Sequence, residues 1–201
     1  MTLPSQDRRN RCIRLDLGCG RAKQLGYVGL DRRILPGVDV VANLEAPLPF
    51  GDNTLGAVYS NNVLEHLDNF ELLMAELHRT VMPGGEIHLL VPHFSSPLSF
   101  SDFTHRRFFG YYTFDYFVPE AHQISRRKVP DFYTPFKFKI LSKRFRFVTY
   151  FRFMRPWLRL WEWLVNSGER WALLYESMLC YLIPCYDLEV RLSPLKDGPV
   201  E

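Results

Sequence analysis

Short apolar runs that end at polar or turn-forming residues dominate the first half of the chain. They lie at residues 11–17, 27–30, 38–42, 55–59 and 86–91. Apolar runs of about four to eight residues that are bounded by turn signals are typical of buried strands. We therefore expect five strands in this half of the chain.

One helix is predicted among these strands. Apolar residues recur every three or four positions over residues 68–82, and Asp68 with Glu71 resembles a capping box at the start. The Pro-Gly-Gly sequence at residues 83–85 predicts the end of this helix. Strands that alternate with helical or short connections favour a doubly wound, mostly parallel α/β sheet.

The pattern changes after Pro92. Residues 137–147 alternate between apolar and polar positions, which predicts an edge strand, and residues 187–192 predict a last strand. Two amphipathic helices are expected at residues 155–166 and 169–183. The predicted fold class is therefore α/β: a doubly wound, mostly parallel sheet with an antiparallel edge strand and a C-terminal aromatic helical appendage.

Composition separates the two halves further. Of the 201 residues, 47% are hydrophobic and 23% are charged, which excludes a disordered or collagen-like chain. Residues 1–100 carry 9 basic and 11 acidic side chains, whereas residues 101–201 carry 16 and 11. Six of the 30 aromatic residues lie in the first half. The second half therefore has the composition of a surface that meets something apolar, aromatic or anionic.

The cysteines and the first residues of the sequence indicate the cellular compartment. The spacing of Cys12, Cys19, Cys180 and Cys185 matches neither a disulfide scaffold nor a zinc ribbon, so we expect reduced thiols. No histidine–cysteine spacing indicates a metal site. The start of the sequence has no apolar core of a signal peptide, and no apolar stretch is long enough to span a bilayer. We expect a cytoplasmic protein, with peripheral membrane contact as an option.

Four segments with candidate chemistry follow successive strands. Leu15-Asp16-Leu17-Gly18-Cys19-Gly20 ends the first strand, and its alternating glycines either let a ligand approach the backbone or only form a tight turn. Asp31 ends the second strand, where an acid accepts hydrogen bonds from ribose hydroxyls. Residues 43–50 and 60–66 follow the third and fourth strands. Lys23 stands where the dinucleotide fingerprint needs its third glycine, which argues against NAD.

Together these segments resemble the class I, Rossmann-like methyltransferases that use S-adenosylmethionine, in particular small bacterial members. LDLGCG, GLD, ANLEAPLPF and SNNVLEHL, followed by MPGGEIHLLVP, occur in the order of that family's motifs and cover residues 12–92. The resemblance implies a single methyltransferase domain over residues 1–201. Residues 12–92 would form its cofactor-binding core, and residues 93–201 its acceptor side and cap.

The resemblance also implies S-adenosylmethionine as cofactor and a role for seven residues. The amino-acid part would contact Asp16, Gly18 and Gly20, the ribose would contact Asp31, and the adenine would lie beside Asn43 and Leu44. Asn61 would line the floor near the methionine moiety. Asn43 departs from the family pattern, which often has aspartate there.

The first crossover is unusually short. Only residues 18–26 join the first two strands, whereas a parallel crossover usually needs at least about 10–12 residues. Hence at most one helical turn fits, and one face of the sheet lacks a cover. The aromatic C-terminal half is the expected cover.

Two histidines are candidate catalytic residues for an acceptor hydroxyl. His93 follows the fifth strand, and His105 lies nearby with Asp102 and Arg106 beside it. Either could act as a base or orient the acceptor, because ligands of open α/β sheets bind beyond the carboxyl ends of the strands. His66, after the fourth strand, is a weaker candidate. For all three, a purely structural role is the alternative.

The acceptor and the partners stay open. Residues 126–159 interleave 11 basic residues with ten aromatics, which suits an anionic membrane, a nucleic acid or an edge strand with a basic outer face. The apolar face of residues 155–183 requires burial against the sheet, in a homodimer or in a membrane surface. We expect O-methylation of a small-molecule, saccharide or lipid-linked acceptor. The alternatives are an RNA methyltransferase, with nucleic acid the less favoured partner, and a non-catalytic binding protein.

Overall fold

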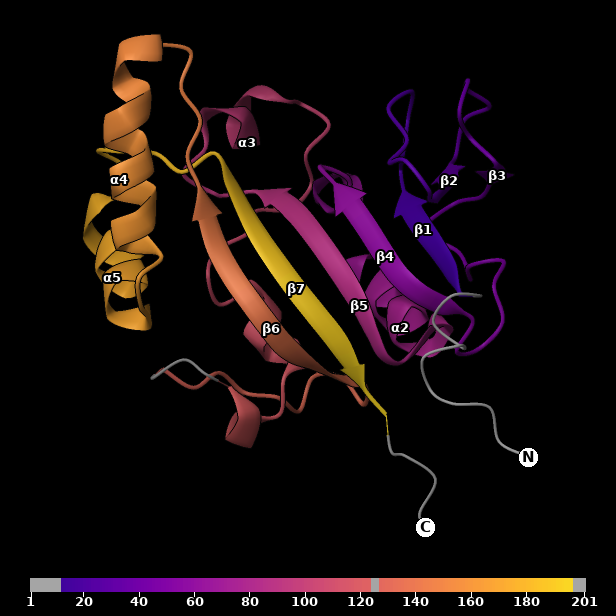
Figure 1. Cartoon of the computed structure of the whole chain (residues 1–201). Coiled ribbons are helices and arrows are strands. Elements are labelled where there is room, and N and C mark those ends of the chain that lie inside the picture. Colours follow the sequence, from indigo (N-terminus) through magenta and orange to yellow (C-terminus); the bar gives the residue numbers. More distant parts are fainter. Residues whose placement is uncertain (1–11, 124–126, 197–201) are drawn as a thin grey trace.

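The computed structural model describes residues 12–123 and 127–196. They contain one seven-stranded sheet in the order β3-β2-β1-β4-β5-β7-β6 (Figure 1). The strands are β1 (Ile13–Leu17), β2 (Val28–Asp31), β3 (Val40–Val41), β4 (Leu55–Asn61), β5 (Val81–Pro92), β6 (Lys137–Arg146) and β7 (Asp187–Leu195). All seven predicted strands are present, although residue 11 of the first prediction lies outside the described residues.

The strand directions confirm the predicted fold class. Strands β1 to β5 pair in parallel, whereas β7 pairs antiparallel with β5 on one side and with the edge strand β6 on the other. The residues between β1 and β2 form turns without a helix, as the short crossover predicts. The parallel strands therefore end together at one edge of the sheet, where a ligand site is expected.

The helix predicted at residues 68–82 is α2 (Phe70–Thr80), and both of its ends differ from the prediction. Its N-cap is Asn69, whose side chain accepts from the backbone N–H of Leu72, so Asp68 is not the capping residue. The backbone turns extended at Val81, ahead of the Pro-Gly-Gly sequence, and β5 begins there. Residues 81–85 thus belong to the strand.

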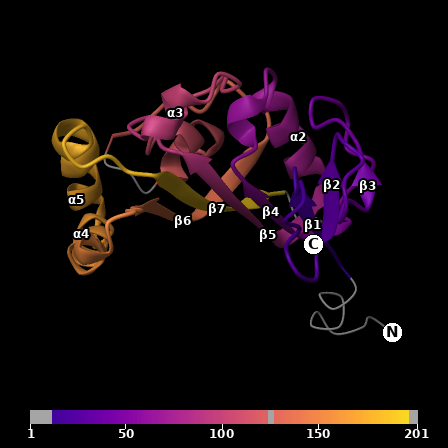
Figure 2. The same cartoon turned by 90° about the horizontal axis from the view of Figure 1, so that it is seen from above.

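Helix α2 and the short α3 (Pro97–Ser101) lie on the same face of the sheet (Figure 2). We call this the covered face. Its core is apolar, because alternate residues of the central strands point into it. The fully buried residues include Leu15, Leu17, Leu73, Met74, Leu77, Ile87 and Leu89.

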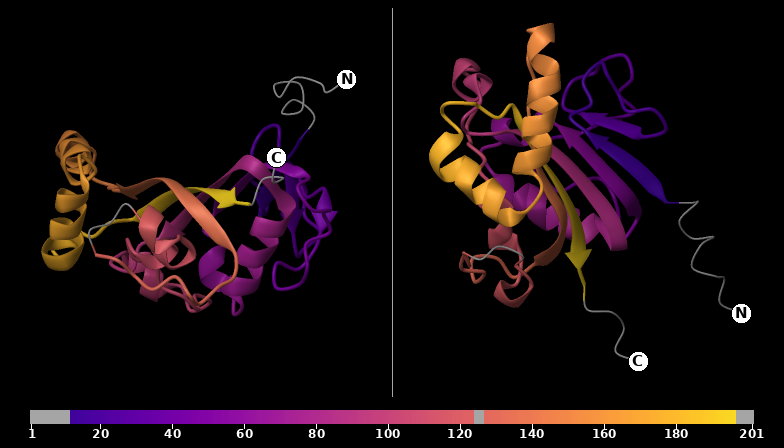
Figure 3. Two further views of the ribbon diagram at one scale, coloured as in Figure 1. Left: turned by 90° about the horizontal axis from the view of Figure 1, so that it is seen from below. Right: turned by 60° about the vertical axis from the view of Figure 1, so that its left-hand side comes forward.

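The C-terminal helices do not cover the opposite face. Helices α4 (Arg155–Val165) and α5 (Glu169–Leu174), which continues as a π-helical turn over Tyr175–Leu179, stand beyond the edge strand β6 (Figure 3, left). They pack around Tyr175, whose ring contacts Phe145, Phe147 and Trp161. The expectation that they close over the sheet is therefore wrong.

The opposite face, called here the uncovered face, needs no apolar cover. Within residues 12–123 and 127–196, no helix lies over it (Figure 2). Arg14 stacks on Tyr27, Tyr59 contacts both Tyr27 and His88, and His88 pairs with Glu189 at 3.0 Å. Side chains of this kind keep favourable contacts with water. The absence of a helix on this face therefore exposes little apolar surface. In the same described part of the chain, no helix has the length and apolar character that crossing a bilayer requires.

Candidate active site

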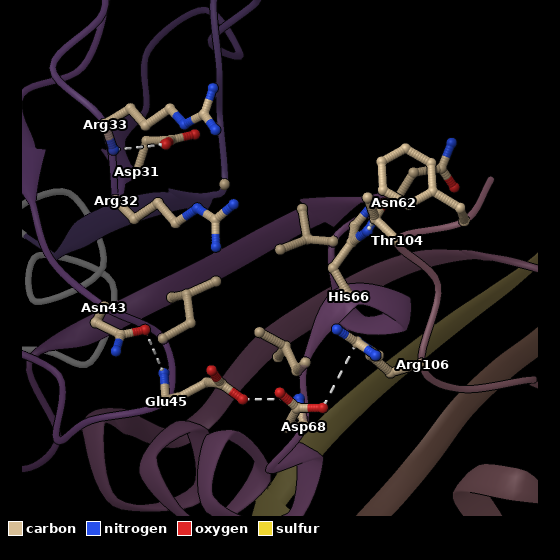
Figure 4. A pocket seen from close by; sticks show the side chains of 15 residues that line it. Asp31, Arg32, Arg33, Asn43, Glu45, Asn62, His66, Asp68, Thr104 and Arg106 are labelled. Carbon is tan, nitrogen blue, oxygen red and sulfur yellow. Dashed lines mark hydrogen bonds and ion pairs between the residues drawn. The ribbon is translucent and has the colours of Figure 1, made fainter.

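A cavity of about 550 Å³ opens beyond the carboxyl ends of β1, β2 and β4 (Figure 4). Segments from far apart in the sequence meet here because parallel strands end at the same edge of the sheet. The residues that line it are Gly18, Asp31, Arg32, Arg33, Asn43, Leu44, Glu45, Asn62, Val63, His66, Leu67, Asp68, Phe103, Thr104 and Arg106. Four of the predicted cofactor residues are among them: Gly18, Asp31, Asn43 and Leu44.

The glycine loop after β1 requires glycine at two positions. Gly18 and Gly20 have φ angles of +61° and +51°, a region that other L-residues rarely adopt. A Cβ atom on Gly18 would lie 2.6 Å from Val63 Cγ2, whereas a Cβ atom on Gly20 would meet nothing within 4 Å. Val63 therefore packs closely against Gly18 and leaves no room for a side chain there, whereas Gly20 needs glycine only for its backbone conformation.

Asp31 joins this loop to the end of β2. Its Oδ2 accepts from the backbone N–H of Gly20 at 3.0 Å, and its Oδ1 accepts from that of Arg33 at 2.9 Å. Each carboxylate oxygen has a further lone pair, which leaves acceptor capacity for hydroxyl groups. Arg32 and Arg33 lie on either side of the carboxylate in Figure 4 and give this end of the cavity positive charge.

Asp16 and Asn61 do not line the cavity. Asp16 is 3% exposed, its Oδ2 accepts from the backbone N–H of Gln24 at 2.7 Å, and burial raises its pKa. It thus shapes the glycine loop from behind. Asn61 is exposed at the end of β4, and the lining residue is its neighbour Asn62, with φ +53° and its N–H donated to the Leu90 carbonyl. Roles for Asp16, Gly20 and Asn61 at a ligand stay predictions.

The segment after β3 is fixed to the start of α2 by Glu45, a residue that the sequence motifs did not single out. Asn43 Oδ1 accepts from the Glu45 N–H at 3.1 Å. Glu45 Oε1 accepts from the N–H groups of Asp68 and Asn69 at 2.7 and 3.0 Å. Asn43 therefore has a structural partner although it departs from the family pattern, and Leu44 is held at the wall with 7% exposure.

His66 lies at the other end of the cavity and is held by a residue from a distant loop. Its Nδ1 is 2.9 Å from Thr104 Oγ1, and that hydroxyl lies 2.6 Å from Asp102 Oδ1. A carboxylate can only accept, so Thr104 donates its one proton to Asp102 and accepts from His66 Nδ1. His66 Nε2 then keeps its lone pair. Burial, and secondly the neighbouring His105, lower the pKa of His66.

The two histidines predicted as catalytic lie outside the cavity wall. The His105 ring contacts the His66 ring at 4.9 Å, edge to face, and its Nδ1 lies 3.2 Å from the Ser99 carbonyl oxygen. His93 is fully buried on the C-terminal side, where it bonds Ser95 and Glu176. His66 thus separates His105 from the cavity. His93 packs among residues of the C-terminal half.

Comparisons with known proteins agree with this geometry. A family model described as a methyltransferase domain matches residues 15–89. A demethylmenaquinone methyltransferase of Renibacterium salmoninarum is 34% identical over 73 residues. That match covers 36% of this chain and 30% of the relative, so the chain corresponds to less than a third of the curated relative's length.

Solved structures share the fold. An S-adenosylmethionine-dependent methyltransferase from Archaeoglobus fulgidus is 16% identical with a TM-score of 0.52, over 94% of this chain and 89% of that one. The YcgJ protein of Bacillus subtilis is 12% identical with a TM-score of 0.52, over 96% and 97%. A structure from a Haloferax volcanii complex of a methyltransferase with its Trm112 activator is 12% identical with a TM-score of 0.55, over 96% of this chain and 89% of that one.

The chain therefore has a class I methyltransferase fold, and residues 15–89 match the methyltransferase domain family within it. S-adenosylmethionine is the cofactor of this class, as the sequence motifs predict. The cavity fits it: Asp31 offers carboxylate lone pairs for a ribose, and Gly18 lines the same cavity beside it.

Proposed function

We propose that the protein transfers the methyl group of S-adenosylmethionine to a hydroxyl of a small-molecule, saccharide or lipid-linked acceptor. The observation that carries the proposal is one continuous cavity with Asp31 and the glycine loop at one end and His66 with Thr104 at the other. The first end suits the cofactor, and the second suits a polar acceptor. Neither end alone would define a transferase.

The proposal places the cofactor by residue. The ribose hydroxyls would bind Asp31, and the adenine would lie beside Asn43 and Leu44. Asp16 and Asn61 would act next to the amino-acid part, on either side of the loop that Gly18 and Gly20 form. Bound S-adenosylmethionine supplies a methyl group on a sulfonium, which is an activated leaving group.

The protein's own contribution is then mainly orientation. The acceptor oxygen would be aligned with the methyl carbon by the polar groups at the His66 end, and alignment of this kind supplies about 7–11 kcal/mol of barrier reduction. His66, held by Thr104 and backed by His105, is the group that faces this oxygen. His93 lies too far inside the C-terminal packing to take part, so we assign it no role at the acceptor.

Cofactor binding is tested with Asp31→Ala. The change removes a charged acceptor of two hydroxyl hydrogen bonds, each worth about 1.5–3 kcal/mol, so calorimetry should show at least a tenfold loss of affinity. Asp52→Ala is the control, because Asp52 is an exposed acid that pairs with Arg79 away from the cavity. Equal affinity in the two variants would contradict the placement of the ribose.

Methyl transfer is tested with radiolabelled cofactor and cell extract separated into lipid, saccharide and RNA fractions. We expect label in the lipid or saccharide fraction. Label in RNA would support the alternative of a nucleic-acid methyltransferase. Tight cofactor binding without label in any fraction would support a non-catalytic binding protein.

The lipid-linked acceptor is favoured by an exposed aromatic surface on α4, α5 and their flanking segments. Its side chains are between 46% and 84% exposed, whereas large apolar side chains on soluble proteins are usually exposed only singly. The members of this surface are Tyr150, Phe151, Phe153, Trp157, Leu160, Trp163, Trp171, Met178, Tyr181 and Leu182.

Charge at this surface favours an anionic membrane over a second protein copy. The arginines of α4, α5 and the preceding turn, Arg152, Arg155, Arg159 and Arg170, are all exposed. Two of the nearby acids hold backbone groups: Glu162 accepts from the N–H of Phe147 at 3.0 Å, and Glu176 from that of Tyr111 at 2.6 Å. An outward face of aromatics and arginines is the composition that anionic lipid surfaces attract.

Sedimentation with vesicles of phosphatidylserine and phosphatidylcholine tests membrane contact. We expect binding that falls at high salt and is lost when Leu160 and Trp163 are both changed to Ala. Ile34→Ala is the matched control, since Ile34 is 88% exposed at the other edge of the sheet. A stable dimer that the same double variant dissociates, without vesicle binding, would instead assign the aromatic surface to a homodimer.

A further inference from the structure

Three potential metal ligands meet behind the acceptor end of the cavity. Glu65 and His66 come from the 3₁₀ turn Leu64–His66 after β4, and His105 comes from the loop after α3. One candidate ligand atom from each lies within 4.8 Å of the others. The spacing of histidines and cysteines in the sequence did not indicate this group, because its members are 39 residues apart.

We propose that Glu65, His66 and His105 bind a divalent transition-metal ion, with Zn²⁺ the best match, that holds the acceptor hydroxyl. The inference rests on the proposed function and deepens it. Two imidazoles and one carboxylate form a known type of catalytic zinc site, in which the fourth position stays open for substrate.

The state of Glu65 is the first observation. It is 1% exposed, and neither carboxylate oxygen has a hydrogen-bond partner among the described residues. His105 Nε2 lies 3.9 Å from Glu65 Oε1, which is beyond hydrogen-bond distance. A buried carboxylate without hydrogen bonds is costly, and a bound cation removes that cost.

The orientation of the two imidazoles is the second observation. His66 Nδ1 donates to Thr104, and His105 Nδ1 faces the Ser99 carbonyl oxygen, which can only accept. Both rings therefore carry a proton on Nδ1, and in the neutral form each has its lone pair on Nε2. Metal-binding histidines are held in this way, with the other ring nitrogen donating to a protein oxygen.

The electrostatics around His105 agree. Its Nε2 lies 3.7 Å from Asp102 Oδ2 as well as 3.9 Å from Glu65 Oε1. Two carboxylates around one imidazole nitrogen attract a cation, either a proton on Nε2 or a metal ion bound to it. Bond lengths of about 2.0–2.2 Å place tetrahedral ligand atoms about 3.4 Å apart, so ligand atoms that now lie up to 4.8 Å apart must approach by up to about 1.4 Å.

His66 connects the metal to the reaction, because it also lines the cavity. An acceptor hydroxyl at the open coordination position would have a lowered pKa and release its proton to water in the cavity. The acceptor oxygen would then form a bond to the methyl carbon while the bond from sulfur to that carbon breaks and sulfur keeps the electron pair. No oxidation or reduction occurs in this sequence.

Metal binding is tested on the full chain after treatment with a chelator. Calorimetry with Zn²⁺ should show one site per chain, and Co²⁺ should give the visible absorption of a low-symmetry site with nitrogen and oxygen ligands. Glu65→Gln and His105→Asn should each weaken binding at least 100-fold. Thr104→Val, which removes the hydroxyl between His66 and Asp102 and leaves all three ligands in place, should weaken it about 10–100-fold.

The control is His88→Asn, which breaks a histidine–glutamate pair of 3.0 Å on the uncovered face, where the described residues offer no third ligand. It should leave the Zn²⁺ affinity unchanged. If a ligand variant fails to fold, the unchanged protein is tested alone with Zn²⁺, Co²⁺ and Mn²⁺. The inference is overturned if none of these ions binds with a stoichiometry of one per chain. An equal loss in His88→Asn and in the ligand variants overturns it as well.

Failure of the metal site and failure of the proposed function are distinguishable. Undiminished methyl transfer by metal-free protein would overturn the inference and leave the proposed function intact. Stoichiometric metal binding without methyl transfer to any fraction would support the metal site and contradict the proposed methyltransferase function. The result that supports both is transfer that the chelator removes and Zn²⁺ restores.

Discussion

The two faces of the sheet both carry ion pairs, yet the surroundings of these pairs are opposite. On the covered face Lys143 and Asp115 meet at 2.6 Å with both side chains fully buried. On the uncovered face Arg191 and Glu86 meet at 3.1 Å with both side chains 44% exposed. The face without helices carries polar and charged strand residues that stay in contact with water. The loss of a charge should therefore lower the stability of the protein much more on the covered face than on the uncovered face.

The largest effect is expected from Lys143→Met. The Lys143 ammonium also donates to the Tyr111 carbonyl at 3.0 Å and lies over the Tyr111 ring, while burial lowers the pKa of this lysine. Removing the cation leaves a buried carboxylate without its main partner, which costs about 3–5 kcal/mol. Chemical denaturation of the variant should show a loss of unfolding free energy of that size.

A double variant separates lost charge from lost packing. Lys143→Met with Asp115→Asn removes both charges, and replacing both members of a buried pair is often close to neutral. The double variant should therefore regain at least half of the loss. If it is as unstable as the single variant, the pair matters through shape and the contrast between the faces is not electrostatic.

Lys143 also shows why the sequence predicts the strand but not its pair. In the sequence it belongs to a basic run that alternation assigns to an outer face. A register irregularity between Ile140 and Ser142 changes which positions point inward, from Phe138 and Ile140 to Lys143 and Phe145. A bulge of this kind depends on the partner strand, so no local pattern indicates it.

Some residues of the candidate site are likewise predictable from the sequence, and others are not. Gly18, Asp31, Asn43 and Leu44 could be placed from the sequence, because each follows a strand and the carboxyl ends of parallel strands meet. Thr104 and Glu65 could not, since their importance comes from contacts with residues that the fold brings near. His66 was recognisable as a candidate, but its priority over His105 at the cavity wall depends on the path of the loop after α3.

An intermediate, pH-dependent effect is expected from Asp187→Asn. Asp187 begins β7, is 9% exposed, and burial raises its pKa to about 6, with Arg146 opposing the shift. Its stabilising contribution is complete only below the ordinary pKa and is lost as the pH rises through about 6. Asparagine stays neutral, so the variant should gain about 1–3 kcal/mol over the natural chain near pH 8 and nothing near pH 4.

Thermal unfolding at several pH values measures this difference. A gain that is constant across the range would mean that packing, and not ionisation, distinguishes the two side chains. A gain that grows as the pH falls would contradict the raised pKa itself. Either result would show that the Asp187 carboxylate is as well solvated as the exposed charges of Glu86 and Arg191, although it is 9% exposed.

The smallest effect is expected from Arg191→Ala on the uncovered face. Arg191 contacts Glu86 at 3.1 Å and Glu189 at 3.5 Å, but its side chain is 44% exposed. Exposed pairs of this kind contribute about 0–1 kcal/mol, because water and salt screen them. The unfolding free energy should therefore fall by less than about 1 kcal/mol, and the difference should vanish near 1 M salt, where the screening length is about 3 Å. A loss of about 2 kcal/mol or more that persists at high salt would show that the uncovered face is shielded from water in solution, and the contrast with Lys143 would then disappear.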